Sequence, residues 1–124
     1  MKNITKILSA TIIGLNLFSV PALAGTWIQH EGYDLSLTNG IYKGGWEYEL
    51  DTNKKAMGWH QIDNKWYYFY PEDGCAATGI TNILNKDYFF NPDTCELETN
   101  KWVRTRGITL WVENDGSINY SKTR

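Results

Sequence analysis

The chain has 124 residues, with 12 lysines and arginines against 14 aspartates and glutamates, which gives a formal net charge of −2 at pH 7. A surface that follows phosphates needs clustered basic residues, and here only Arg104 and Arg106 lie close together, so no nucleic acid partner is expected. Aromatic residues stand out, with six Trp, eight Tyr and four Phe. A small core does not need so many rings, so we expect some of them to face solvent or a ligand.

The first 24 residues are expected to be a secretory signal peptide. Lys2 and Lys6 precede an apolar run over residues 7–20, and Ala22 and Ala24 then supply the small residues that signal peptidase accepts three and one before the cut, with cleavage after Ala24. A retained membrane anchor is the alternative, but the run is shorter than the ~20 residues that a bilayer span needs, so no transmembrane segment is expected. The remaining ~100 residues are enough for one small domain, and without the two lysines their formal charge is −4.

A pattern with a period of about 20 residues organises the rest of the chain. It is clearest at Trp59 and Trp66, which lie seven residues apart. The same spacing returns in two later pairs, Ile80 with Asp87 and Trp102 with Thr109. Trp46 stands twenty residues before Trp66, which indicates a shorter fourth copy. A period of this length fits one β-hairpin plus a link, and because a lone hairpin buries too little to be stable, neighbouring copies must stack.

Each copy predicts two short strands around a tight turn. In the clearest copy the strands are expected at residues 58–62 and 66–70, with Asp63-Asn64 as the turn, because Asn tolerates positive φ. Asn85 and Arg106-Gly107 take the same place in the next two copies. Turn-rich links in which proline fixes φ follow the hairpins at residues 71–74 and 91–94.

The expected fold class is therefore all-β, a β-solenoid of stacked β-hairpins with about four short repeats. Residues 25–45, with the turn dipeptide Asn39-Gly40, fit the period poorly and are predicted to form an N-terminal capping hairpin. The hairpin repeats are expected over residues 46–118, and residues 119–124 form a polar tail.

Two cysteines, Cys75 and Cys95, occupy similar places in the two links, 20 residues apart. An exported chain reaches a compartment that allows pairing, so we predict a disulfide between successive repeats, which would contribute roughly 3 kcal/mol of stability in the chain-entropy model. No metal site is expected, because these cysteines and the two histidines, His30 and His60, lack ligand spacing. No cofactor motif is found.

One stretch carries a specific resemblance. Residues 58–79 read GWHQIDNKWYYFYPEDGCAATG, with Gly58-Trp59, then Asn64 to Phe69, then Asp73-Gly74 and Ala77-Thr78-Gly79. This stretch is similar to the choline-binding, or cell-wall-binding, repeat of Gram-positive surface proteins and their phages. With its weaker copies, the resemblance covers residues 44–118.

The resemblance implies a left-handed solenoid that holds the choline of teichoic acid in aromatic boxes between consecutive hairpins. A quaternary ammonium cannot donate a hydrogen bond, so the faces of Trp and Tyr rings suit it, at about 0.5 to 2 kcal/mol for each contact. Carried over to this chain, the first box takes Trp59 and Trp66 with a third ring from Tyr88 or Phe89. A second, partial box sets Trp46 against Tyr68.

Later boxes depart from the family pattern. Ile80 and Asp87 stand where two Trp are expected, and Thr109 replaces another. Trp102 and Trp111 are interpreted as core rings, with an altered site as the alternative.

Three functions fit these observations. The first is a small exported module that binds choline or a teichoic-acid-like cell-wall polymer bearing it, either secreted or attached to the cell surface, with a periplasmic location as an alternative. The second is a carbohydrate-binding (glucan-binding) repeat module, because aromatic platforms also stack on sugar faces. The third is a secreted structural or protein-interaction subunit, and the exposed hairpin edges at either end of the stack would allow end-to-end dimerisation.

An enzyme is the least favoured class. The serines of the mature chain, Ser36, Ser117 and Ser121, lack a nucleophile motif, and neither histidine is paired with one. Three acidic residues alternate along one predicted strand and so share a face, namely Glu47, Glu49 and Asp51. Glycoside hydrolysis would need one of these groups in an apolar pocket, whereas such an edge is more often solvated.

Overall fold

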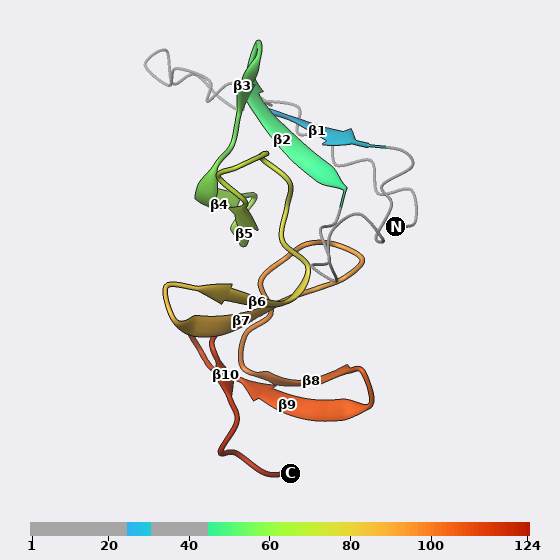
Figure 1. Cartoon of the computed structure of the whole chain (residues 1–124), viewed down its shortest axis with the longest axis vertical. Helices are drawn as coiled ribbons and strands as arrows, with labels where there is room; N and C mark the ends of the chain where they lie inside the picture. The colour runs from blue at the N-terminus through green and yellow to red at the C-terminus, as the bar shows by residue number, and fades with distance from the viewer. Residues whose placement is uncertain (1–24, 31–44) are drawn as a thin grey trace, which may run out of the picture.

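The computed structural model describes residues 25–30 and 45–124, and within these two ranges it contains β-strands and turns but no helix (Figure 1). The predicted signal peptide and the Asn39-Gly40 turn lie outside the described residues. In chain order the strands are β1 (Thr26–Gln29), β2 (Trp46–Asp51), β3 (Lys54–Lys55), β4 (Gly58–Ile62), β5 (Lys65–Phe69), β6 (Gly79–Ile83), β7 (Lys86–Phe90), β8 (Lys101–Thr105), β9 (Ile108–Val112) and β10 (Ile118–Asn119).

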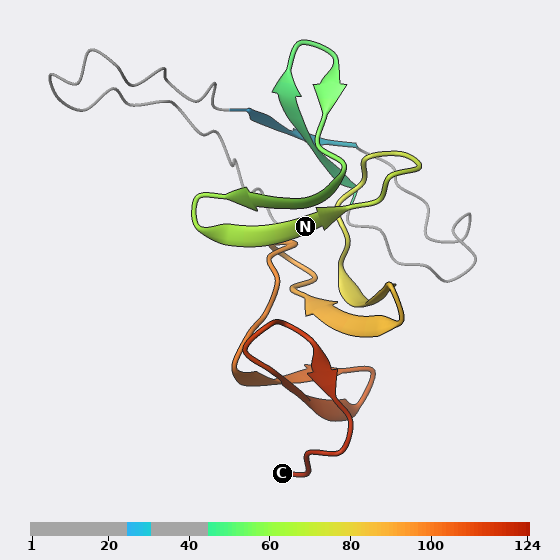
Figure 2. The same ribbon diagram turned by 90° about the vertical axis from the view of Figure 1, so that its left-hand side faces the viewer.

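Four antiparallel hairpins follow one another along the long axis of the molecule, as Figures 1 and 2 both show. The pairs are β1 with β2, β4 with β5, β6 with β7, and β8 with β9, while the short β3 and β10 add to the edges of the first and last hairpins. The predicted fold class, an all-β stack of about four hairpin repeats, is confirmed.

The tight turns explain why these residues form hairpins. In the second hairpin, φ is 51° at Asp63 and 63° at Asn64, so both central turn residues have the positive φ of a two-residue hairpin turn whose twist matches the flanking strands. Leu84 and Asn85 repeat this conformation with φ of 50° and 63°. The last hairpin uses Arg106-Gly107, as the sequence predicted.

The links fix one hairpin onto the previous one by backbone hydrogen bonds. After the second hairpin, the amide of Ala76 donates to the carbonyl of Trp46 in the first hairpin at 2.7 Å. After the third hairpin, the amide of Leu97 donates to the carbonyl of Trp66 in the second hairpin at 2.8 Å. Trp46 and Trp66 therefore occupy equivalent positions in successive repeats, which the spacing of twenty residues had predicted.

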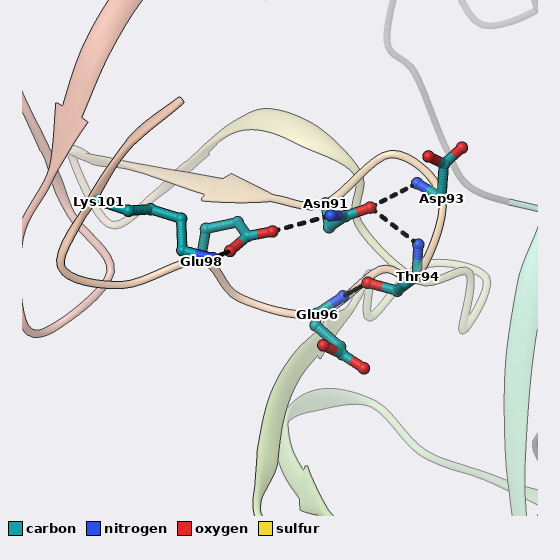
Figure 3. Close-up of polar contacts among 6 residues, drawn as sticks. All are labelled: Asn91, Asp93, Thr94, Glu96, Glu98 and Lys101. Atoms are coloured by element: carbon teal, nitrogen blue, oxygen red, sulfur yellow. Dashed lines mark hydrogen bonds and ion pairs between the residues drawn. The ribbon is translucent and has the colours of Figure 1, made fainter. Parts of the chain in front are cut away.

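Side chains of the second link (residues 91–100) hold its own shape (Figure 3). The amide oxygen of Asn91 accepts hydrogen bonds from the backbone of Asp93 and Thr94 at 2.8 and 3.1 Å, while its amide nitrogen donates to Glu98 at 2.8 Å. Lys101 then pairs with the other oxygen of Glu98 at 2.6 Å. The link is thus a defined turn that sets the spacing between the third and fourth hairpins.

Three clusters of buried side chains run along the stack. The first joins the upper two hairpins through rings such as Trp27, Tyr67 and Phe69. The middle cluster centres on Phe90, and the last on Val112. The last residue of the second strand is fully buried in each of the last three hairpins, namely Phe69, Phe90 and Val112. The core therefore repeats with the same period as the sequence.

The predicted disulfide between Cys75 and Cys95 is wrong for this structure, where both side chains are buried and no bond joins them. The prediction aligned the links with an offset of 20 residues, but they superpose with an offset of 21. The amides of Gly74 and Cys95 donate to the carbonyls of Tyr70 and Asn91 respectively, and φ is 77° at Gly74 and 64° at Cys95. Cys95 therefore corresponds to Gly74, so the two cysteines do not occupy equivalent positions in their links.

Both ends of the described chain are attached to the stack. At the N-terminal end, β1 pairs with β2. β1 lies in the predicted cap (residues 25–45) and β2 in the predicted repeats (residues 46–118), and this division of the chain stays a prediction. In the tail, the Tyr120 hydroxyl donates to Asp87 at 2.6 Å, and the Lys122 ammonium lies 3.6 Å from the centre of the Trp111 ring. Within residues 25–30 and 45–124, no helix has the length and apolarity required to span a bilayer.

Candidate functional site

A cavity of about 370 Å³ opens between the second and third hairpins. Three aromatic rings, those of Trp59, Trp66 and Tyr88, line it. The remaining lining residues come from the links, namely Leu97, Thr99, Asn114 and Asp115. A volume of this size lies within the usual range for sites that hold small molecules.

The strand register places two of the rings on the same face of one hairpin. Trp59 on β4 is opposite Tyr68, and Trp66 on β5 is opposite Gln61, two positions further along. Because alternate residues of a strand share a face, the two indoles become diagonal neighbours, with centroids 6.4 Å apart and planes at 80°. They form two walls of a corner.

Tyr88 supplies the third ring from β7 of the next hairpin. Its centroid lies 5.0 Å from that of Trp59, with the planes at 75°. Phe90, two residues further along β7 and fully buried, packs behind Trp59 at 5.7 Å and fixes the indole from below. Trp66 is 45% exposed, so the corner opens to water at its rim.

One of the polar residues that line the cavity, Asp115, carries a carboxylate. Its Oδ2 accepts a hydrogen bond from the Lys86 ammonium at 2.8 Å, and its Oδ1 accepts from the amide and hydroxyl of Ser117 at 2.9 and 2.5 Å. The hydrogen bonds from Lys86 and Ser117 lower the pKa of Asp115 well below its ordinary value of 3.8, although partial burial acts in the opposite direction. The carboxylate is therefore ionised at neutral pH.

The ring arrangement recurs one repeat earlier. Trp27 lies 6.3 Å from Trp46 with planes at 81°, and 4.9 Å from Tyr67 with planes at 63°. These values match the set formed by Trp59, Trp66 and Tyr88. We call the earlier rings the buried ring set (Trp27, Trp46 and Tyr67) and the later ones the open ring set (Trp59, Trp66 and Tyr88).

The two sets differ in their exposure to water. All three residues of the buried set are at most 8% exposed. Burial raises the pKa of the Tyr67 hydroxyl far above its ordinary value of 10, and the nearby Glu96 adds to the shift. The indole N–H of Trp46 is also buried, and it has no hydrogen-bond acceptor among the residues that the structure describes.

The structure separates the members of the predicted second box. Trp46 belongs to the first core cluster, whereas Tyr68 packs on Trp59 at 5.4 Å and on Tyr70 at 5.9 Å beside the middle cluster. In this structure Tyr68 therefore lies beside Trp59 of its own hairpin, apart from the cluster that holds Trp46. Of the two alternatives for the third ring of the first box, Tyr88 lines the cavity and Phe89 is buried in the last cluster.

Among the described residues, no ring set lies between the third and fourth hairpins. Ile80 and Asp87 stand in the two Trp positions, and Asp87 instead accepts hydrogen bonds from Tyr120 and Asn82. Trp102 and Trp111 pair across β8 and β9 at 5.4 Å, which is the relation of Trp59 to Tyr68 within one hairpin and not that of a box.

Three residues around the ring sets were missed by the sequence analysis. Tyr67 could have been found, because it precedes Tyr88 by the same 21 residues that separate Gly58 from Gly79. Trp27 could not, because residues 31–44 separate it from its partner strand and break the period. Asp115 gave no signal, since its link reaches the cavity only because the repeats stack on one another.

No cluster of metal-ligating side chains occurs among the described residues.

The comparisons with known proteins agree with this geometry. Residues 56–102 match the family model of the choline-binding repeat. The matched segment includes all three rings of the open ring set. It ends before the third link, which carries Asp115.

Solved structures share the fold. Choline binding protein F from Streptococcus pneumoniae superposes with a TM-score of 0.57 at 22% identity, covering 75% of this chain and 27% of that one. The cell wall endolysin of phage Cp-1, in a complex with choline, gives a TM-score of 0.57 at 20% identity, covering 77% of this chain and 24% of that one.

A curated relative is Toxin A of Clostridium novyi, which is 32% identical over 82 residues. The match covers 51% of this chain and 4% of the toxin. The chain therefore spans only a small part of the length of the proteins that it resembles.

Proposed function

We propose that the chain is a binding module that takes the quaternary ammonium of choline, free or carried by a cell-wall polymer, into the cavity of the open ring set. The observation that carries the proposal is the corner of Trp59, Trp66 and Tyr88, three rings from two hairpins around a cavity that opens to water. Ring faces attract a cation that cannot donate a hydrogen bond. A small, strongly hydrated ion would instead be bound better by water than by the rings.

The repeat family and the solved neighbours support the same ligand. The endolysin of phage Cp-1 was solved with choline, and choline binding protein F was also solved in the presence of a peptidoglycan analogue. A cell-wall polymer is accordingly the proposed partner of this chain, and a secreted or surface-associated location follows from that role. The proposed activity is binding without catalysis.

The expected affinity is weak. Three rings at about 0.5 to 2 kcal/mol each, reduced by the cost of immobilising the ligand, correspond to a Kd on the order of millimolar for one cavity. Several cavities or several chains on one polymer would be needed for tight attachment.

Titration with choline, followed by tryptophan fluorescence, tests the proposal. A saturable change with a millimolar Kd is expected, because two of the lining rings are indoles. Trp66→Ala should weaken binding by about tenfold or more, since it removes the most exposed wall. Tyr120→Ala is the matched control, because Tyr120 is an exposed ring outside the cavity.

Two outcomes would contradict the proposal. One is the absence of any saturable response up to about 100 mM choline, a concentration well above the millimolar regime of a single ring cavity. The other is saturable binding of a neutral glucan with no response to choline, which would support the carbohydrate-binding alternative. Either outcome would leave the described fold unchanged and would rule out choline binding as the function of the cavity.

A further inference from the structure

The polar wall of the cavity comes from a different repeat than its rings. The rings belong to the second and third hairpins, whereas Asn114 and Asp115 belong to the third link (residues 113–117), which follows the fourth hairpin. The third link reaches back because Ser117 bridges to Tyr88 on β7. Three consecutive repeats are therefore required to complete one cavity.

Close packing at Gly116 fixes the position of Asp115. Gly116 has φ of 85°, and a Cβ at this position would lie 2.6 Å from the side chain of Leu97, which itself lines the cavity. The absent side chain lets the third link lie directly on the second. Ser117 holds the carboxylate from the other side, so Asp115 is oriented before any ligand arrives.

Asp115 lines the same cavity as the three rings, and its carboxylate pairs with Lys86. Lys86 and Asp115 are both about half exposed, at 53% and 52%, so their ion pair is solvated and contributes little by itself. A ligand cation between the rings and Asp115 would compete with the Lys86 ammonium for the same oxygen.

We propose that Asp115 is the specificity-determining residue of the cavity: it selects an organic cation over a neutral ligand of the same shape, and Lys86 acts as its internal competitor. This inference rests on the proposed function, since it concerns the same cavity. Ring faces and Leu97 bury an apolar group whether or not it is charged, so they discriminate only in part. A carboxylate in the cavity lining adds an attraction that a neutral ligand does not feel.

The second link shows that the fold does not require an acid at this position. Thr94 corresponds to Asp115, because each accepts a hydrogen bond from the amide two residues later, that of Glu96 or Ser117. Each also precedes a residue with positive φ, Cys95 or Gly116. A threonine satisfies the turn equally well, so the charge of Asp115 is available for recognition.

The test compares choline with 3,3-dimethyl-1-butanol, in which a carbon replaces the nitrogen and removes the charge. Both are titrated by tryptophan fluorescence against the wild type, Asp115→Asn and Asp73→Asn. Asparagine keeps the oxygen that accepts from Ser117, so the link is retained. Asp73 is the matched control, because it accepts from the amide of Cys75 in the first link but lies outside the cavity lining.

In Asp115→Asn, the Kd for choline should rise about three- to tenfold while that of the neutral alcohol is unchanged. Asp73→Asn should behave like the wild type with both ligands. Lys86→Met should lower the Kd for choline about two- to threefold, since the carboxylate loses its competitor. Added salt should weaken choline binding to the wild type more than to Asp115→Asn.

Equal preference for choline over the alcohol in the wild type and in Asp115→Asn would overturn the inference and leave the proposed function standing. A parallel loss of both ligands in Asp115→Asn would also overturn it, because that result indicates a structural role. A wild type that binds neither ligand removes the proposed function and this inference together.

Discussion

The buried and open ring sets have almost the same internal geometry but opposite relations to water. Trp46 and Trp66 are equivalent by their hydrogen bonds to the following link, yet Trp46 is 6% exposed and Trp66 is 45% exposed. The same corner of rings is a core element in one repeat and the wall of a cavity in the next. A ring pattern thus specifies a corner, and the neighbours of that corner decide whether it can take a ligand.

The largest expected effect separates the two sets by stability. Trp46→Ala should lower the free energy of unfolding by about 3 to 5 kcal/mol, because it removes a buried ring from the first core cluster. Trp66→Ala should cost about 1 kcal/mol or less, because nearly half of that ring is already in water. Urea denaturation followed by circular dichroism measures both.

Similar losses from these two variants would break the comparison. Trp66 would then be a core ring, and the loss of choline binding in Trp66→Ala could not be assigned to a missing contact.

A smaller effect should fall on the open set alone. Gly116→Ala places a methyl group against Leu97 at a backbone conformation that disfavours side chains, so it should cost about 1 to 3 kcal/mol and displace Asp115. Gly58→Ala is the matched control, because Gly58 also has positive φ, 74°, but open space around it. Choline affinity should fall in Gly116→Ala and be retained in Gly58→Ala.

Equal choline affinity in the two glycine variants would contradict the role of the third link in completing the cavity. Their urea midpoints provide the accompanying stability measurement, and the larger loss is expected for Gly116→Ala.

Acid is expected to destabilise the hairpin that carries Trp46. Burial alone would raise the pKa of Glu47, but hydrogen bonds and charges from Lys55 and His30, 2.9 and 3.0 Å away, outweigh it and hold the pKa below its ordinary value of 4.5. A lowered pKa in the folded state stabilises the fold above the ordinary value, and that stability is lost as the pH falls through the folded-state pKa.

In the wild type, the thermal midpoint should therefore decrease as the pH is lowered from about 4.5. Glu47→Gln should make the thermal midpoint less dependent on pH in this range. Identical acid profiles for the two proteins would show that other carboxylates carry the acid sensitivity.

The smallest effect is expected in the tail. Lys122→Ala removes an ammonium 3.6 Å from the centre of the Trp111 ring and should cost about 0.5 kcal/mol, because the contact is exposed. It should leave choline affinity unchanged, since neither residue lines the cavity. A change in choline affinity would indicate that Trp111 belongs to an altered site.

Much of the fold could be predicted from local patterns. The turns at Asp63-Asn64 and Asn85 depend on residues that tolerate positive φ, so their positions fixed the hairpins. The spacing of Trp59 and Trp66 placed both indoles on one face, because strand periodicity is local.

The links were harder to predict, because their conformation depends on hydrogen bonds between repeats. An offset of 20 aligned Cys75 with Cys95, whereas the backbone superposes with an offset of 21 and aligns Cys95 with Gly74. One residue of error was enough to predict a disulfide that the structure lacks.

The sequence by itself determined the repeating unit, its turns and which strand face carries the rings, because each of these depends on neighbouring residues. Only the tertiary structure decided that Trp27 and Trp46 are buried while Trp66 borders a cavity, and that Asp115 faces it from two hairpins away. The physical reason is that exposure, and the approach of a charge to a ring, are set by how the links stack one hairpin on another.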